Sequence, residues 1–474
     1  MTVSTPSEAN HWVAPYSSAG DSHSRPQDLK PSMSVHLHEF LRLSLIAIFG
    51  YLACSLPDSF TVLILLAMAA RPQSYLKAYR LGGQTIIAGC LMLAALLILD
   101  ALTLEVPPFS LPGERAMDTA RWLLLLLGFV PLADGLAGKP FRIAVLLGAA
   151  LAGFFTGLLK TTPPKSILLF KNDLQTGFHL TAPTTGLIAG TAILGLLIFG
   201  PLMLEKGARN PLWRAIKIAL WGVSLYLSTF MLMASQSRAT YLACAIVIPL
   251  ALWIQDQKRP SQEGSRRVKM GLQIATLFLI VEGLAINHEA IWHRIEPDVS
   301  SLKEIVTSAA PRKSPPAAES SLNLRWAVLQ EAFRVIKEKP FFGWGPLSSR
   351  SLIASSGDER LMTPVTRLWL AHFHNGYAEI IVRSGLIGFL IILIGLKLMA
   401  QSLISAIQER SPPRDWVIFC LSSLTMILIW GLSSNFNSDP VRGLITLISA
   451  TSFSLAIYSK PRRLNQSVHI ERTS

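Results

Sequence analysis

The residues best suited to chemistry are the histidines and the asparagine of the sequence His372-Phe373-His374-Asn375. An unperturbed imidazole titrates between about pH 5 and 8, so it can accept a proton from a hydroxyl group near neutral pH. This sequence closes a long polar segment, and the apolar window 376–399 follows it at once. We therefore expect His372, His374 and Asn375 at a membrane surface, where an active site can meet both lipid head groups and water.

Two arginines are candidates for binding an anion. Arg238 follows Ser237 in a turn between two apolar windows, and this turn is too short to need an arginine for solubility. Arg325 lies on an expected amphipathic helix that ends before Pro340 and whose apolar face combines Leu322, Trp326, Leu329, Phe333 and Ile336. A guanidinium can donate two parallel hydrogen bonds to a phosphate group. Either arginine could instead anchor the chain at the membrane surface.

The composition predicts an all-α, polytopic membrane protein that holds these residues. The chain has 474 residues, of which 51% are hydrophobic and 15% are charged. Because a spanning helix needs about 20 mostly apolar residues, we expect about twelve transmembrane helices, near residues 38–55, 58–70, 82–104, 119–136, 141–159, 183–204, 214–234, 239–255, 268–287, 376–399, 415–433 and 441–458. The windows within 38–70 and at 119–136 are the least regular, because they contain Pro57-Asp58 and Pro131 with Asp134.

The formal charge of +14 is explained by topology rather than by nucleic acid. Lysine and arginine are concentrated in every second loop, and such basic loops face the cytoplasm. This predicts an inner-membrane protein with both termini in the cytoplasm and with outer loops at 105–118, 160–182, 235–238, 288–375 and 434–440. The expected parts are a disordered tail (1–36), a transmembrane bundle (37–287), a large periplasmic loop (288–375), further transmembrane helices (376–459) and a cytoplasmic tail (460–474).

Neither the cysteines nor any spaced motif indicates a metal or a cofactor. The four cysteines all fall inside predicted spans, where they act as small apolar residues: Cys54, Cys90, Cys244 and Cys420. The chain shows no glycine-rich phosphate loop and no Cys/His metal motif. Within the outer loop, residues 307–320 are rich in Ser, Pro and Ala and are expected to be flexible.

Together these residues resemble the O-antigen ligase and polymerase superfamily. The resemblance is carried by His374-Asn375 followed by Gly385-Leu386-Ile387-Gly388, by the Ser237-Arg238 turn, and by the Arg325-Trp326 helix with its exit Pro340-Phe341-Phe342-Gly343-Trp344-Gly345. It covers residues 180–400 well. Gly385 and Gly388 are expected to permit close helix packing.

The resemblance implies a glycosyltransferase that works without nucleotide or metal. Such enzymes move a glycan from undecaprenyl diphosphate to a sugar hydroxyl, on the lipid A core for a ligase or on another repeat unit for a polymerase. Arg238 and Arg325 would then bind the diphosphate and His374 would be the general base, while His372 or Asn375 would orient it or bind sugar.

Several alternatives stay open. Ligase is favoured over O-antigen or exopolysaccharide polymerase, and both belong to lipopolysaccharide or polysaccharide synthesis. A transporter of the same lipid-linked glycan is the rival from another class, but transporters usually place ionisable groups at mid-membrane, whereas here polar residues converge on one face. A non-catalytic scaffold is the third possibility.

Overall fold

The fold is helical throughout the part of the chain that the computed structural model describes. That part comprises residues 33–103, 126–168, 180–205, 210–257, 263–289, 321–345, 348–361, 372–408, 413–436 and 439–458, with short pieces at 119, 121–123, 178, 292–293, 296 and 370. These residues contain no strand. Contacts divide the chain into residues 1–41 and 42–474, and the candidate residues all belong to the second unit.

The helices follow one another with short connections. In the first half of the chain they are α1 (Met33–Ser55), α2 (Pro57–Ala70), α3 (Pro72–Ala78), the π-helix η1 (Tyr79–Gly83), α4 (Gln84–Thr103), α6 (Phe129–Leu136), α7 (Pro140–Thr161) and α8 (Pro164–Leu168). In the second half they are α9 (Ala182–Glu205), α10 (Pro211–Ser235), α11 (Arg238–Asp256), α12 (Glu263–Ile286), α14 (Ser321–Glu338), α15 (Ser348–Ala354), η2 (Glu359–Leu361), α17 (Gly376–Gln408), α18 (Arg414–Gly431), α19 (Asp439–Phe453) and η3 (Ser454–Tyr458).

The expected membrane architecture is confirmed in its class. Among the described residues, eight helices are long and apolar enough to cross a membrane, and each matches a predicted window. Residues 58–70 and 268–287 contain the shorter apolar helices Asp58–Ala70 and Gln273–Ile286. Helix α4 covers most of window 82–104, and window 119–136 contains the short helix α6. The total of twelve spans and the side of the membrane that each loop faces stay predictions.

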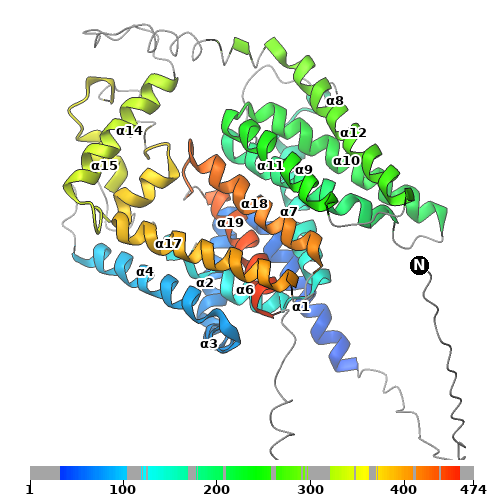
Figure 1. The fold of residues 1–474 in the computed structure, drawn as a ribbon, viewed down its shortest axis with the longest axis horizontal. Coiled ribbons are helices and arrows are strands. Elements are labelled where there is room, and N and C mark those ends of the chain that lie inside the picture. The colour runs from blue at the N-terminus through cyan, green and yellow to red at the C-terminus, as the bar shows by residue number, and fades with distance from the viewer. Residues whose placement is uncertain are drawn as a thin grey trace, which may run out of the picture. The chain divides into compact units, whose positions relative to one another are not determined.

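Helix α9 lies at the centre of the group formed with α10, α11 and α18 (Figure 1). Its glycines allow these neighbours to come close. A Cβ atom at Gly186 would lie 2.6 Å from the hydroxyl of Ser235, and one at Gly190 would lie 2.6 Å from the sulfur of Cys244. Small residues serve the same purpose in membrane helix packing generally, where lipid offers no hydrophobic gain for association.

Helix α17 is broken near its N-terminal end. It has 33 residues, which at 1.5 Å per residue is about 50 Å, well beyond the hydrocarbon core of about 30 Å. Gly385 interrupts it with φ 65° and ψ −175°, a conformation essentially limited to glycine. The remaining residues 386–408 make a helix of about 35 Å, which is enough to cross the membrane alone.

The loop of residues 340–345 inserts its backbone at this break. Leu386 N–H donates to the Pro340 carbonyl at 2.8 Å, and Trp344 N–H donates to the Val382 carbonyl at 2.7 Å. These bonds replace helical bonds that the break removes. A Cβ atom on Gly385 would lie 2.0 Å from the Phe341 carbonyl oxygen. Gly385 is therefore required for backbone contact with this loop, in place of the helix packing expected from the sequence.

Helices α14 and α15 lie beside the first part of α17 (Figure 1) and share a second apolar core with it. This core buries the small α14 residues Ala327, Val328, Ala332 and Val335. The predicted helix is present, but its predicted apolar face is wrong, since Trp326 and Phe333 are 54% and 55% exposed. Small side chains let α14 approach α17 closely, so the large aromatic residues face outward.

Some predictions fall outside the described residues. These are the tails 1–32 and 459–474, most of loop 105–118, and residues 307–320 of the outer loop. Within the described part of 288–375, the segment is mainly helical, because it contains α14 and α15.

Candidate active site

Asn375 is the N-cap of α17. Its side-chain Oδ1 accepts hydrogen bonds from the backbone N–H groups of Tyr377 and Ala378, both at 3.0 Å. Its Nδ2 donates to the carbonyl oxygen of Leu432 at 3.0 Å, just beyond the end of α18. Asparagine is among the preferred N-cap residues for this reason. Both ends of the amide are thus engaged in structure, so Asn375 fixes where the histidine segment meets α17 and α18.

The two histidines stand side by side, as the sequence led us to expect. The ring centroids of His372 and His374 lie 4.3 Å apart, with the planes tilted by 38°. Phe373 between them is buried in the core with α14 and α15, whereas both imidazoles are half-buried. His374 has a left-handed backbone with φ 51°, a region in which histidine occurs more often than most residues.

A buried ion pair holds the histidine segment from behind. The Glu379 carboxylate accepts hydrogen bonds from the backbone N–H of Phe373 at 3.0 Å and from the Ser349 hydroxyl at 2.6 Å. Arg383 Nε donates to the same carboxylate at 2.6 Å. Glu379 and Arg383 are 1% and 4% exposed. Glu379 therefore connects α15 and the first turns of α17 to the peptide between the two histidines.

The sequence analysis missed this network. Its signal was available, since Glu379 and Arg383 are four residues apart on one helical face within a strongly apolar window. Ionisable residues in such a window either pair with each other or serve a site. Ser349 gave no comparable signal, because only the fold brings α15 against α17.

The local field keeps His374 uncharged. Burial, followed by the positive charges of His372 and Arg325, lowers the pKa of His374 from its usual 6.5 to about 3. Burial also lowers the pKa of His372, and the charges of Arg383 and Arg325 act in the same direction, while Glu379 opposes them. His374 is therefore a neutral imidazole with a free lone pair near pH 7. The expectation that the free protein titrates this residue near neutrality is wrong.

Arg325 belongs to the same group as the histidines. It lies in the second turn of α14 and is half-buried. Its charge acts on both imidazoles, as their lowered pKa values show. The loop 340–345 connects α14 to the break in α17, so the backbone bonds at Gly385 also determine where Arg325 stands.

Arg238 reaches this end of the helices by a different route. It begins α11 after the tight turn at Gln236, which has a left-handed φ of 45°. The turn packs against Gly186 near the start of α9, and Trp430 Nε1 near the end of α18 donates to the Pro183 carbonyl there at 3.0 Å. Because Asn375 binds Leu432 at the same end of α18, the Arg238 turn and the histidine segment are joined through the ends of α9 and α18.

The site thus has a neutral base, a half-buried arginine beside it and a second arginine near the same helix ends. The described residues include no group of three or more His, Cys, Asp or Glu side chains that could hold a metal ion. The first turn of α17 also begins here, and the positive end of a helix dipole favours an anion. The arrangement suits a reaction that removes a proton from one group while negative charge develops on another.

Comparison with known proteins gives one match. Residues 223–393 match the family model described as O-antigen ligase. This confirms the resemblance to the O-antigen ligase and polymerase superfamily. The matched region contains all five candidate residues: Arg238, Arg325, His372, His374 and Asn375. No curated protein matches the chain.

Proposed function

We propose that this membrane protein with an O-antigen ligase region transfers a glycan from undecaprenyl diphosphate to a sugar hydroxyl on the periplasmic face. The observation that carries the proposal is the pairing of His372 and His374, 4.3 Å apart, within the field of Arg325 at the start of a spanning helix. The match over residues 223–393 supports the same class of enzyme.

In the proposed reaction, the acceptor hydroxyl oxygen attacks the anomeric carbon of the donor glycan. A bond forms between that oxygen and the carbon, and the bond from the carbon to the diphosphate oxygen breaks. The hydroxyl proton moves to the free lone pair of His374, and the electrons of the broken bond leave with the lipid diphosphate. A correctly placed general base contributes about 100-fold to 10,000-fold to such a rate.

Arg325 and Arg238 would stabilise the charge on the leaving diphosphate. Guanidinium groups suit this task, because they donate paired hydrogen bonds to phosphate oxygens. The bound diphosphate would also act on the base. Its negative charge would offset Arg325 and raise the pKa of His374 from the low value of the free site. The donor would then make the imidazole more basic when it is needed.

We favour a ligase in the inner membrane that joins O-antigen to the lipid A core, with both termini in the cytoplasm. A polymerase that extends O-antigen or exopolysaccharide repeat units is the alternative, because the same superfamily and the same chemistry cover both. The donor glycan and the acceptor sugar are set by surfaces outside the group described above.

The lipopolysaccharide banding pattern of a deletion strain tests this proposal. A ligase predicts loss of all polymer from the lipid A core, with lipid-linked polymer accumulating in the membrane. A ladder that collapses to a single repeat unit on the core would identify a polymerase instead. An unchanged pattern, with exopolysaccharide also intact, would contradict the proposed function.

A further inference from the structure

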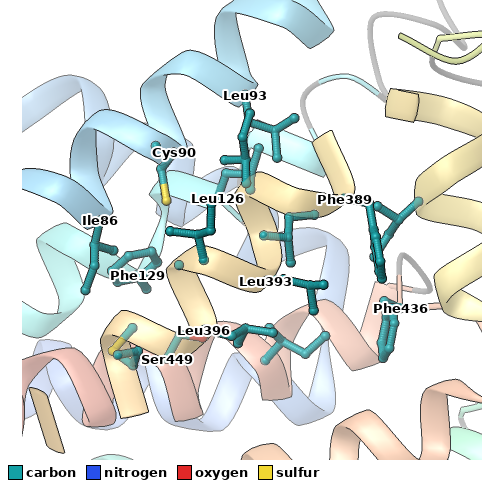
Figure 2. A pocket seen from close by; sticks show the side chains of 18 of the residues that line it. Ile86, Cys90, Leu93, Leu126, Phe129, Phe389, Leu393, Leu396, Phe436 and Ser449 are labelled. Carbon is teal, nitrogen blue, oxygen red and sulfur yellow. The ribbon is translucent and has the colours of Figure 1, made fainter. Parts of the chain in front are cut away.

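An apolar groove runs between α4 and α17. It encloses about 430 Å³, within the range of about 300–1,000 Å³ found for small-molecule pockets. Side chains of α4, among them Ile86, Cys90 and Leu93, face Phe389 and Leu393 of α17 across it (Figure 2). We call this cavity the α4–α17 groove.

One end of the groove lies under the histidine segment. Tyr377 and Phe436 line this end, and their rings pack edge to face with centroids 5.5 Å apart. The Phe436 ring also covers Gly376, where a Cβ atom would lie 2.4 Å from it. Gly376 is the neighbour of Asn375 in the chain. The groove therefore begins beside the proposed reaction centre.

The other end lies within the membrane-spanning part of α17. Leu396 and Ser449 stand at the far end from Phe389 and Phe436 (Figure 2). Met399 also lines the groove, and ten residues of helix after Phe389 correspond to about 15 Å. The groove thus extends from the candidate active site toward the interior of the membrane.

The side of the groove is open, and its floor is closed. Met92 and Ile394 on its edges are both 53% exposed, whereas Phe129 and Ile427 on its floor are both 4% exposed. The Tyr377 hydroxyl near the upper end donates to the Leu428 carbonyl at 2.7 Å. In a bilayer, a chain could enter from the side and would meet an almost wholly apolar lining.

We propose that the α4–α17 groove binds part of the polyprenyl chain of the lipid diphosphate donor. This inference rests on the proposed function and adds the site that holds the lipid half of the donor. A groove of this volume accepts part of one chain, which suits a single-chain lipid better than a two-chain phospholipid. A chain that leaves the upper end carries its head group toward His374 and Arg325, where a diphosphate finds positive charge.

The groove acts by placing the donor rather than by extracting it from lipid. Moving an apolar chain from bilayer to groove gives no hydrophobic gain, because both surroundings are equally apolar. The favourable terms are shape and van der Waals contact, which are individually small. Holding the chain fixes the depth of the diphosphate, and correct placement of a reacting group is worth much more in rate.

Filling the groove tests the proposal. Gly395 lines it, and an added Cβ atom there would have no heavy atom within 4 Å. Gly222 on α10 has the same freedom but does not line the groove, so it supplies the matched control. In Gly395→Trp we expect KM for an undecaprenyl diphosphate donor to rise about tenfold, as contacts of an isoprene unit are lost. We expect kcat, and KM for a donor with a short farnesyl chain, to stay near the values of Gly222→Trp.

Equal KM values for the long-chain donor in Gly395→Trp and Gly222→Trp would overturn the proposal. Cross-linking provides a second measurement that needs no turnover. An undecaprenyl diphosphate with a diazirine on its chain should label α4 and α17 of the wild-type protein in membranes. Unlabelled undecaprenyl diphosphate should compete, and phosphatidylethanolamine should not.

Competition by phosphatidylethanolamine at equal strength would identify an ordinary lipid contact and refute the groove as a donor site. Transfer by the wild-type protein without labelling of α4 or α17 would also refute it, while leaving the proposed function intact. Specific labelling without any transfer would refute the proposed function but support the groove as a polyprenyl site.

Discussion

Replacing Gly385 by alanine tests whether the break in α17 determines the position of Arg325. The conformation at φ 65° and ψ −175° costs about 1–3 kcal/mol for a residue with a Cβ atom. That atom would also lie 2.0 Å from the Phe341 carbonyl oxygen and 2.5 Å from the Phe342 nitrogen. The loop must move to relieve this contact, which weakens the bonds of Leu386 and Ile387 to Pro340 and Phe341, each worth about 1 kcal/mol. The expected loss is about 3–5 kcal/mol.

Unfolding of purified protein in detergent measures this loss, and Gly395→Ala on the same helix is the control. Gly395 has open space around an added Cβ atom, so its substitution should change stability by no more than about 1 kcal/mol. Among molecules that stay folded, Gly385→Ala should reduce transfer by about 100-fold, because a displacement near 1 Å can cost that much in rate. Equal stability and equal transfer in the two variants would refute the role given to the break.

Three further predictions concern the charges of the site and the topology. Arg238→Lys and Arg325→Lys should each impair transfer although the charge is kept, because an ammonium cannot replace a planar guanidinium at a diphosphate; full activity of both variants at normal protein levels would make them surface anchors. A reporter that is active only outside the cytoplasm should be on after Ser314 and off after Gly264; a cytoplasmic signal at Ser314 would remove the periplasmic site. The pKa of His374 near 3 in the free protein means that acid should not protonate this base above pH 5, so kcat/KM should show no acid limb from it, whereas kcat should fall at a higher pH once the bound diphosphate raises that pKa. An acid limb of kcat/KM near pH 6.5 that disappears in His374→Ala would contradict the burial of the imidazole.

The membrane helices were predictable because hydropathy over about 20 residues is a strong signal. The break in α17 was not, although Gly385 was noticed, because a glycine in an apolar window is also typical of close helix packing. Only the backbone of residues 340–345 distinguishes the two roles. The face of α14 was misassigned for a related reason. Large residues such as Trp326 and Phe333 dominate a hydrophobic pattern, whereas the core that formed uses alanine and valine.

The candidate site was predicted in its members more fully than in their roles. Sequence position indicated that His372, His374 and Asn375 share one segment, and the structure adds Arg325 to them through its field. The capping by Asn375 requires the helix to begin at Gly376, which hydropathy cannot locate to one residue. The pKa of His374 depends on burial, and burial depends on α14 and α17 packing together. The support from Glu379 has the same origin, since its partner Ser349 lies on a separate helix.

The measurement that bears most directly on the proposed enzyme is transfer by His374→Ala. Purified lipid-linked glycan and acceptor would be incubated with protein in detergent, with and without chelator. Loss of a general base predicts a rate about 100-fold to 10,000-fold below wild type, with normal insertion and abundance and a smaller loss in His372→Ala. A wild-type rate in His374→Ala would contradict its role as the base.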